Sequence, residues 1–151
     1  MSSTFIFTAE PAVRWPVTVR LPADGGAFAE VAFEALIRVY SETEFERLTP
    51  APGGEKTKST REVLEENADI LPRIVIDWFG VLDARGDPAP IASLAEIIRH
   101  NPYGLPLSAA LWRAINEVRF GLDPKQRGGE TVKNSVPSPA AGRATVEAAT
   151  S

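Results

Sequence analysis

Residues 12–48 read AVRWPVTVRLPADGGAFAEVAFEALIRVYSETEFERL, and this stretch decides the expected fold. In its first part, apolar residues alternate with polar or small ones. These apolar positions are Val13, Trp15, Val17, Val19 and Leu21. A period of two in β-branched and aromatic residues predicts a strand with one buried face. Pro16 has no backbone N–H to donate, so we expect this strand to lie at an edge of its sheet.

The residues on either side of this strand predict a hairpin and then a helix. Phe5, Ile6 and Phe7 form a short apolar run, and Glu10-Pro11 can turn the chain, so we expect a β-hairpin over residues 4–21. The turn residues of PADGG (22–26) end the strand. The apolar residues that follow recur at helical spacing and predict a helix over residues 27–48: Phe28, Val31, Ala32, Ala35, Leu36 and Val39.

Three further helices are expected downstream, over residues 60–79, 93–100 and 107–120. The pairs Ser59/Glu62 and Ser93/Glu96 both match a capping box, in which a hydroxyl and a carboxylate satisfy backbone N–H groups at a helix start. Pro72 lies inside the first of these helices, and we expect a kink or a break near residues 68–71.

Composition changes after residue 120. Residues 121–151 are rich in Gly, Pro, Ser, Ala and Thr and contain few large apolar groups, which is typical of a flexible tail. The predicted architecture is therefore one α+β domain over residues 1–120, with an N-terminal β-hairpin packed on a small bundle of about four helices, followed by this tail.

Charge and composition exclude several classes of protein. The net charge is −4 and the pI about 5.1, and the Lys and Arg residues are scattered, so we expect no nucleic acid partner. The sequence contains no cysteine and no apolar run long enough for a membrane span, and its first residues lack the pattern of a signal peptide, so we expect none. We expect no membrane partner and a cytoplasmic location.

The residues that usually carry chemistry have simpler interpretations here. His100, the only histidine, precedes Asn-Pro at a helix end, where a cation interacts well with the helix dipole. Asp83 and Asp87 flank a glycine in a turn and lack the ligand spacing of a calcium loop. We therefore expect no enzyme, no catalytic residue, no cofactor and no metal.

Aromatic and apolar side chains remain as candidates for binding another protein. Trp15, Trp78 and Trp112 lie on separate elements, and either a core cluster or an exposed groove for a partner helix explains them. The same surface would include four further apolar residues: Phe33, Ile37, Tyr40 and Phe79. A chain with so many apolar helical positions is also expected to form homo-oligomers.

The order of these features resembles the tail assembly chaperones of long-tailed bacteriophages and prophages. Residues 7–26 (FTAEPAVRWPVTVRLPADGG) supply a strand pair with a Trp, then Pro and Asp-Gly. Residues 78–88 (WFGVLDARGDP) supply a Trp-x-Gly-Val-x-Asp-x-x-Gly-x-Pro pattern between helices. The resemblance covers about residues 5–120.

The resemblance implies a non-enzymatic protein that binds and solubilises the long tape measure protein before the tail tube polymerises around it. Such chaperones are absent from the mature virion, and many exist in a longer frameshifted form that recruits the tail tube protein. A structural virion protein, such as a connector or tail-completion subunit, is the alternative. A bacterial regulator or immunity-type module and a small enzyme are less favoured alternatives.

Overall fold

The computed structural model describes residues 11–49 and 58–126. The chain divides into two units, Met1–Arg119 and Phe120–Ser151. In the second unit the structure describes the end of the last helix and a short 3₁₀ helix, Pro124–Gln126. The predicted flexible tail lies outside the described residues from position 127 onward.

A three-stranded antiparallel sheet, in the order β1-β2-β3, forms one layer of the described part of the first unit. Strand β1 spans Ala12–Pro22 and pairs along its whole length with β2, Phe28–Arg38, and the much shorter β3 spans Val75–Phe79. Among the described residues β1 lies at an edge of the sheet, as Pro16 predicts. The expected strand at residues 5–7 lies outside the described residues.

The predicted helix over residues 27–48 is wrong. Most of this segment is β2, and only Glu42–Leu48 is helical (α1). The turn that makes this possible is Asp24–Gly26, in which Gly25 and Gly26 have φ of 79° and 80°. Glycine adopts positive φ without strain, so these residues reverse the chain directly into a hairpin. Pairing with β1 outweighs the helical preference of the Ala and Glu residues in β2.

Helix α2, Thr60–Ile74, also ends earlier than expected, because residues 75–79 leave it as β3. It contains no break at residues 68–71, since Pro72 lies in its last turn. Two helices follow, α3 at Leu94–His100 and α4 at Gly104–Phe120, and the 3₁₀ turn Ile91–Ser93 (η2) precedes α3. The predicted α+β class is confirmed.

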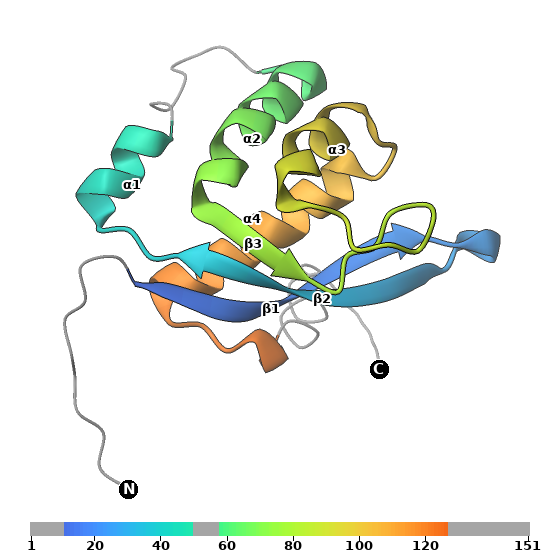
Figure 1. Cartoon of the computed structure of the whole chain (residues 1–151), viewed down its shortest axis with the longest axis horizontal. Helices are drawn as coiled ribbons and strands as arrows, with labels where there is room; N and C mark the ends of the chain where they lie inside the picture. Colours follow the sequence, from blue (N-terminus) through green and yellow to red (C-terminus); the bar gives the residue numbers. More distant parts are fainter. Residues whose placement is uncertain (1–10, 50–57, 127–151) are drawn as a thin grey trace, which may run out of the picture. The chain divides into compact units, whose positions relative to one another are not determined.

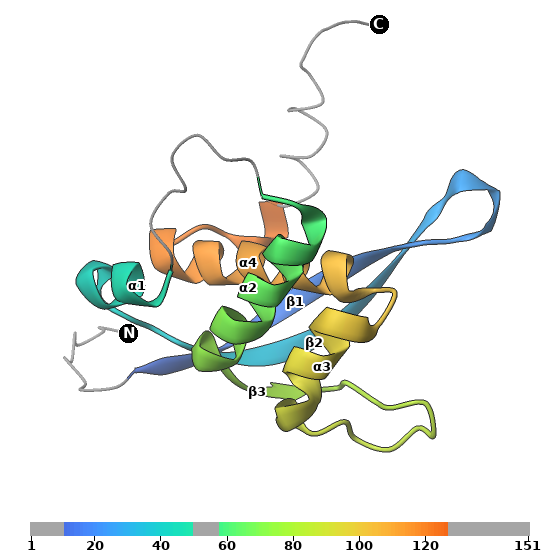
Figure 2. The same ribbon diagram turned by 90° about the horizontal axis from the view of Figure 1, so that it is seen from above.

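The helices form a second layer on one face of the sheet (Figures 1 and 2). The core lies between the layers and is largely apolar, with Val17 and Ile37 from the sheet and Leu71, Leu94 and Leu111 from the helices. Two polar residues of α4, Ser108 and Glu117, are also buried. In β1 and β2 the odd-numbered residues supply the buried face.

The helical layer does not cover the whole hairpin. Figure 2 shows the end of the β1–β2 hairpin extending past α2, α3 and α4. Every residue from 22 to 32 is exposed. This segment is called the hairpin arm below.

Candidate functional site

Two of the seven predicted binding residues belong to the core. Ile37 is 1% exposed and Trp78 is 5% exposed. The Trp78 indole N–H donates a 2.7 Å hydrogen bond to the Ala89 carbonyl, and its ring meets Phe33 edge-on. These side chains therefore hold β2, β3 and the following loop together and are not open to a partner.

The other two tryptophans are partly buried, and both donate to acceptors within the fold. Trp15 Nε1 lies 2.9 Å from Glu117 Oε1, which ties the edge strand β1 to α4. Trp112 Nε1 lies 2.9 Å from Asn67 Oδ1, which ties α4 to α2. Each indole thus fixes the position of a helix, because a buried N–H needs an acceptor.

Tyr40 also has an internal role. Its hydroxyl donates to the Arg73 carbonyl at 3.0 Å, near the end of α2. Phe33 packs partly buried against the core. Both residues thus contribute to the fold, Tyr40 through this hydrogen bond and Phe33 through its edge-on contact with Trp78.

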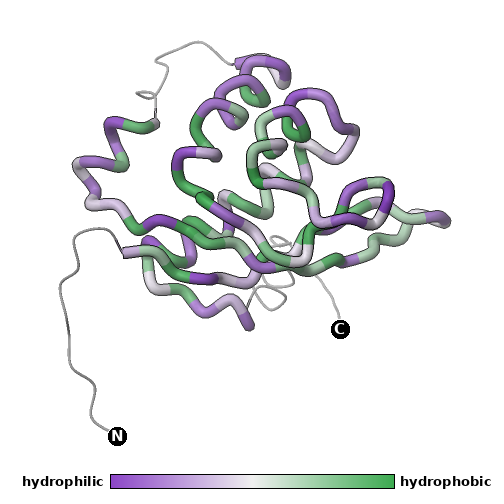
Figure 3. Tube along the Cα trace, viewed as in Figure 1, coloured by the Kyte–Doolittle hydropathy of each residue, from purple (hydrophilic) through white to green (hydrophobic). Residues whose placement is uncertain are grey.

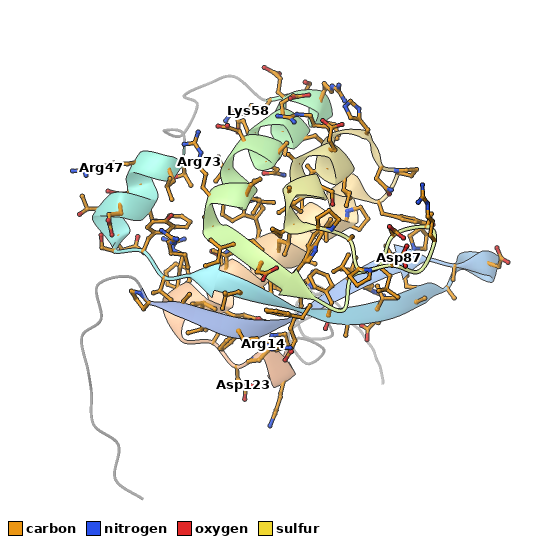
Figure 4. All side chains as sticks on the ribbon, viewed as in Figure 1. Arg14, Arg47, Lys58, Arg73, Asp87 and Asp123 are labelled. Atoms are coloured by element: carbon orange, nitrogen blue, oxygen red, sulfur yellow. The ribbon has the colours of Figure 1, made fainter. Side chains whose placement is uncertain are left out.

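Phe79 differs from the others because it lies on the sheet face that is directed away from the helices. The Arg14 guanidinium stacks on its ring at 3.9 Å, and Arg14 Nε also pairs with Glu34 Oε1 at 2.7 Å. Figure 4 shows Arg14 on this side of the sheet. This small cluster is half-exposed and stabilised by its own cation–π contact.

The hairpin arm provides the apolar surface that the sequence analysis missed. Phe28 is 56% exposed and Val31 is 46% exposed. The Arg20 guanidinium lies 4.4 Å from the centre of the Phe28 ring. Hydrophobic positions continue into the arm (Figure 3). Asp24-Gly25-Gly26 was the signal that could have revealed it, because Asp-Gly between two apolar runs is typical of a hairpin.

Asp83 and His100 have structural partners. Asp83 Oδ1 accepts from the backbone N–H groups of Arg85 and Asp87, so it stabilises the turn as expected. His100 ends α3, with Nε2 at 3.6 Å from Glu96 Oε2. Among residues 11–49 and 58–126, no three His, Asp or Glu side chains lie close enough to hold a metal ion.

Comparison with known proteins finds no matching family, curated protein or solved structure. In the part of the chain that the structure describes, none of the helices has the length and apolar character needed to cross a membrane.

Proposed function

We propose that this chain is a non-enzymatic phage tail assembly chaperone that binds the tape measure protein and keeps it soluble during assembly. The sequence patterns of residues 7–26 and 78–88 support this function by resemblance. In this proposal the protein acts in the host cytoplasm, also meets the tail tube protein, and is absent from the mature virion.

The observation that carries the proposal is the hairpin arm. It exposes Phe28 and Val31 beyond the helical layer, where Phe28 contacts the Arg20 guanidinium. Exposed apolar groups that gather on one element are typical of protein-binding sites. Burying such groups against a client gains about 25 cal/mol for each Å² removed from water.

A client with apolar helical segments suits this surface. Phe28 and Val31 lie on opposite faces of a two-stranded ribbon, so the arm can insert between two segments of a client. The acidic net charge of −4 favours a basic client through long-range attraction and disfavours nucleic acid.

Co-expression with the tape measure protein tests the proposal. The wild-type chain should raise the soluble fraction of the client and co-purify with it. The double substitution Phe28→Thr/Val31→Thr should abolish both effects, because threonine keeps strand preference and removes apolar area. Leu105→Thr is the matched control, since Leu105 is also 46% exposed and lies at the start of α4.

Two results would contradict the proposal. One is a client that is equally soluble without this chain. The other is detection of the chain in stoichiometric amounts in mature particles by mass spectrometry, which would favour the structural virion protein.

A further inference from the structure

The hydrogen-bond register of the hairpin determines which backbone groups of β2 point away from β1. Val39 donates to the Pro11 carbonyl and Ala23 to the Ala27 carbonyl, both at 2.9 Å, just beyond the two ends of the ladder. In an antiparallel pair, bonded and non-bonded residue pairs alternate. The odd-numbered residues of β2 therefore bond to β1, and the N–H and C=O groups of its even-numbered residues point to the other side.

Strand β3 pairs with only some of these outward-pointing residues of β2. It pairs with β2 from Glu34 to Ile37, and the chain then turns away at Gly80, where φ is 91°. Three even-numbered residues precede this point: Phe28, Glu30 and Ala32. Within the described residues their outward backbone groups have no strand beside them. The arm thus carries a short open strand edge.

The opposite edge of the hairpin is protected against strand addition. The outward residues of β1 are also even-numbered, and they include Pro16 and Pro22, which have no N–H to donate. The outward Thr18 carbonyl accepts from Arg113 Nη1 at 3.4 Å. Prolines and covering side chains are common means of blocking an edge. The edge of β2 at residues 28–32 has neither.

We propose that a second copy of this chain pairs with this edge, antiparallel and across a two-fold axis at Ala29. Phe28 of each copy then lies opposite Glu30 of the other and exchanges backbone hydrogen bonds with it, so two of the three outward residues of each copy gain a partner. An axis at Glu30 would set two carboxylates directly opposite each other, which is destabilising. With the axis at Val31, Phe28 of one copy would lie opposite Glu34 of the other. The outward backbone groups of Glu34 already face β3.

Charge complementarity supports the same register. Arg20 stacks on Phe28 on one face of the hairpin. Glu30 of the second copy would lie beside Phe28 on that face, within reach of the Arg20 guanidinium. The pairing also joins two arms into one wider ribbon, with two copies each of Phe28 and Val31. An extended segment of a client protein is the other occupant that the test below distinguishes.

A cysteine substitution at the axis tests the register, because the native chain contains no cysteine. In the proposed dimer the two Ala29 residues form a non-bonded pair with Cα atoms about 4.5 Å apart, a separation that a disulfide can span. Ala29→Cys should therefore form a covalent dimer under mild oxidation. Ala32→Cys, exposed on the same strand, faces the turn of the second copy and should remain at least tenfold less cross-linked.

Glu30→Pro provides a second, independent measurement. The Glu30 N–H points outward, so proline removes a bond to the second copy without removing one to β1. Light scattering should show a dimer for the wild type and a monomer for Glu30→Pro, with unchanged circular dichroism. A wild type that stays monomeric at high concentration, or equal cross-linking at positions 29 and 32, would overturn the proposal.

The experiment uses the purified full chain alone, so it does not depend on the chaperone function. If the wild type is monomeric and Glu30→Pro instead weakens binding of a client, the edge accepts a client strand and the dimer is wrong.

Discussion

Gly104, the first residue of α4, lies buried against the backbone of α3. A methyl group at this position would overlap the Ile98 carbonyl oxygen and lie 3.0 Å from the Ile98 carbonyl carbon. Both contacts are with backbone, which cannot move aside as a flexible side chain can. The absence of a side chain at Gly104 therefore sets how closely α3 and α4 approach.

Gly104→Ala should destabilise the protein although alanine is the better helix former. Alanine gains up to about 1 kcal/mol in helix propensity, whereas overpacking of a tight contact costs about 1–3 kcal/mol. Urea unfolding measured by circular dichroism should show a net loss of stability. An unchanged or higher midpoint would show that the two helices separate at little cost.

Capping explains where the helices begin, and one of the two predicted capping boxes is present. At α2, Ser59 and Glu62 exchange hydrogen bonds as predicted. At α3, the prediction is wrong, because the Ser93 hydroxyl donates to the Pro90 carbonyl within the preceding 3₁₀ turn. A further capping box, Ser41 with Glu44, begins α1.

The capping box of α2 should make stability depend on pH. The backbone N–H and the hydroxyl of Ser59 lower the pKa of Glu62 from its ordinary value of 4.5. A lowered folded-state pKa gives stability that is present above pH 4.5 and is lost as the pH falls through the folded pKa. The stability difference between wild type and Glu62→Gln should therefore shrink between pH 7 and pH 3 in urea unfolding.

Glu46→Gln, at an exposed position of α1, controls for the general effect of removing one negative charge. A Glu62→Gln difference that stays constant over this pH range would contradict the role of the charged carboxylate at the helix start.

At the scale of the whole fold, the helices cover only part of the sheet. One face of β2 is therefore buried at one end and exposed at the other. Ile37 and Val31 lie on the same face of β2, yet one is buried beneath the helices and the other is exposed on the arm. The same kind of residue thus stabilises the fold at one end of the strand and remains available for binding at the other.

Ile37→Ala and Val31→Ala should therefore differ strongly in stability. Loss of the Ile37 side chain leaves a cavity and costs about 2–5 kcal/mol, whereas Val31→Ala costs under about 1 kcal/mol. Chemical denaturation of both variants measures the difference. Similar losses would mean that the arm is packed in solution, for example against a partner.

The sequence predicts binding residues by residue type, and type does not determine exposure. Trp15, Trp78 and Trp112 are the residues that usually anchor interfaces, yet here each donates its indole N–H to an acceptor within the fold. Helical spacing in the sequence predicts Phe28 and Val31 on the apolar side of a helix. Their exposure depends on where α2, α3 and α4 end relative to the hairpin, which no local pattern encodes.

The amino-acid sequence by itself determined the α+β class, the strand at Val13–Leu21, the capping box of α2 and the existence of the last two helices, predicted at 93–100 and 107–120 and observed at Leu94–His100 and Gly104–Phe120. These features follow from local preferences. The alternation of apolar residues in a strand, their spacing in a helix and the capping of a helix end each depend on residues that lie close together in the sequence. Only the tertiary structure decided that residues 28–38 form a strand and that Val75–Phe79 leaves α2 as β3. The physical reason is that strand pairing satisfies backbone groups far apart in sequence, and this long-range gain outweighs helix propensities of under 1 kcal/mol per residue.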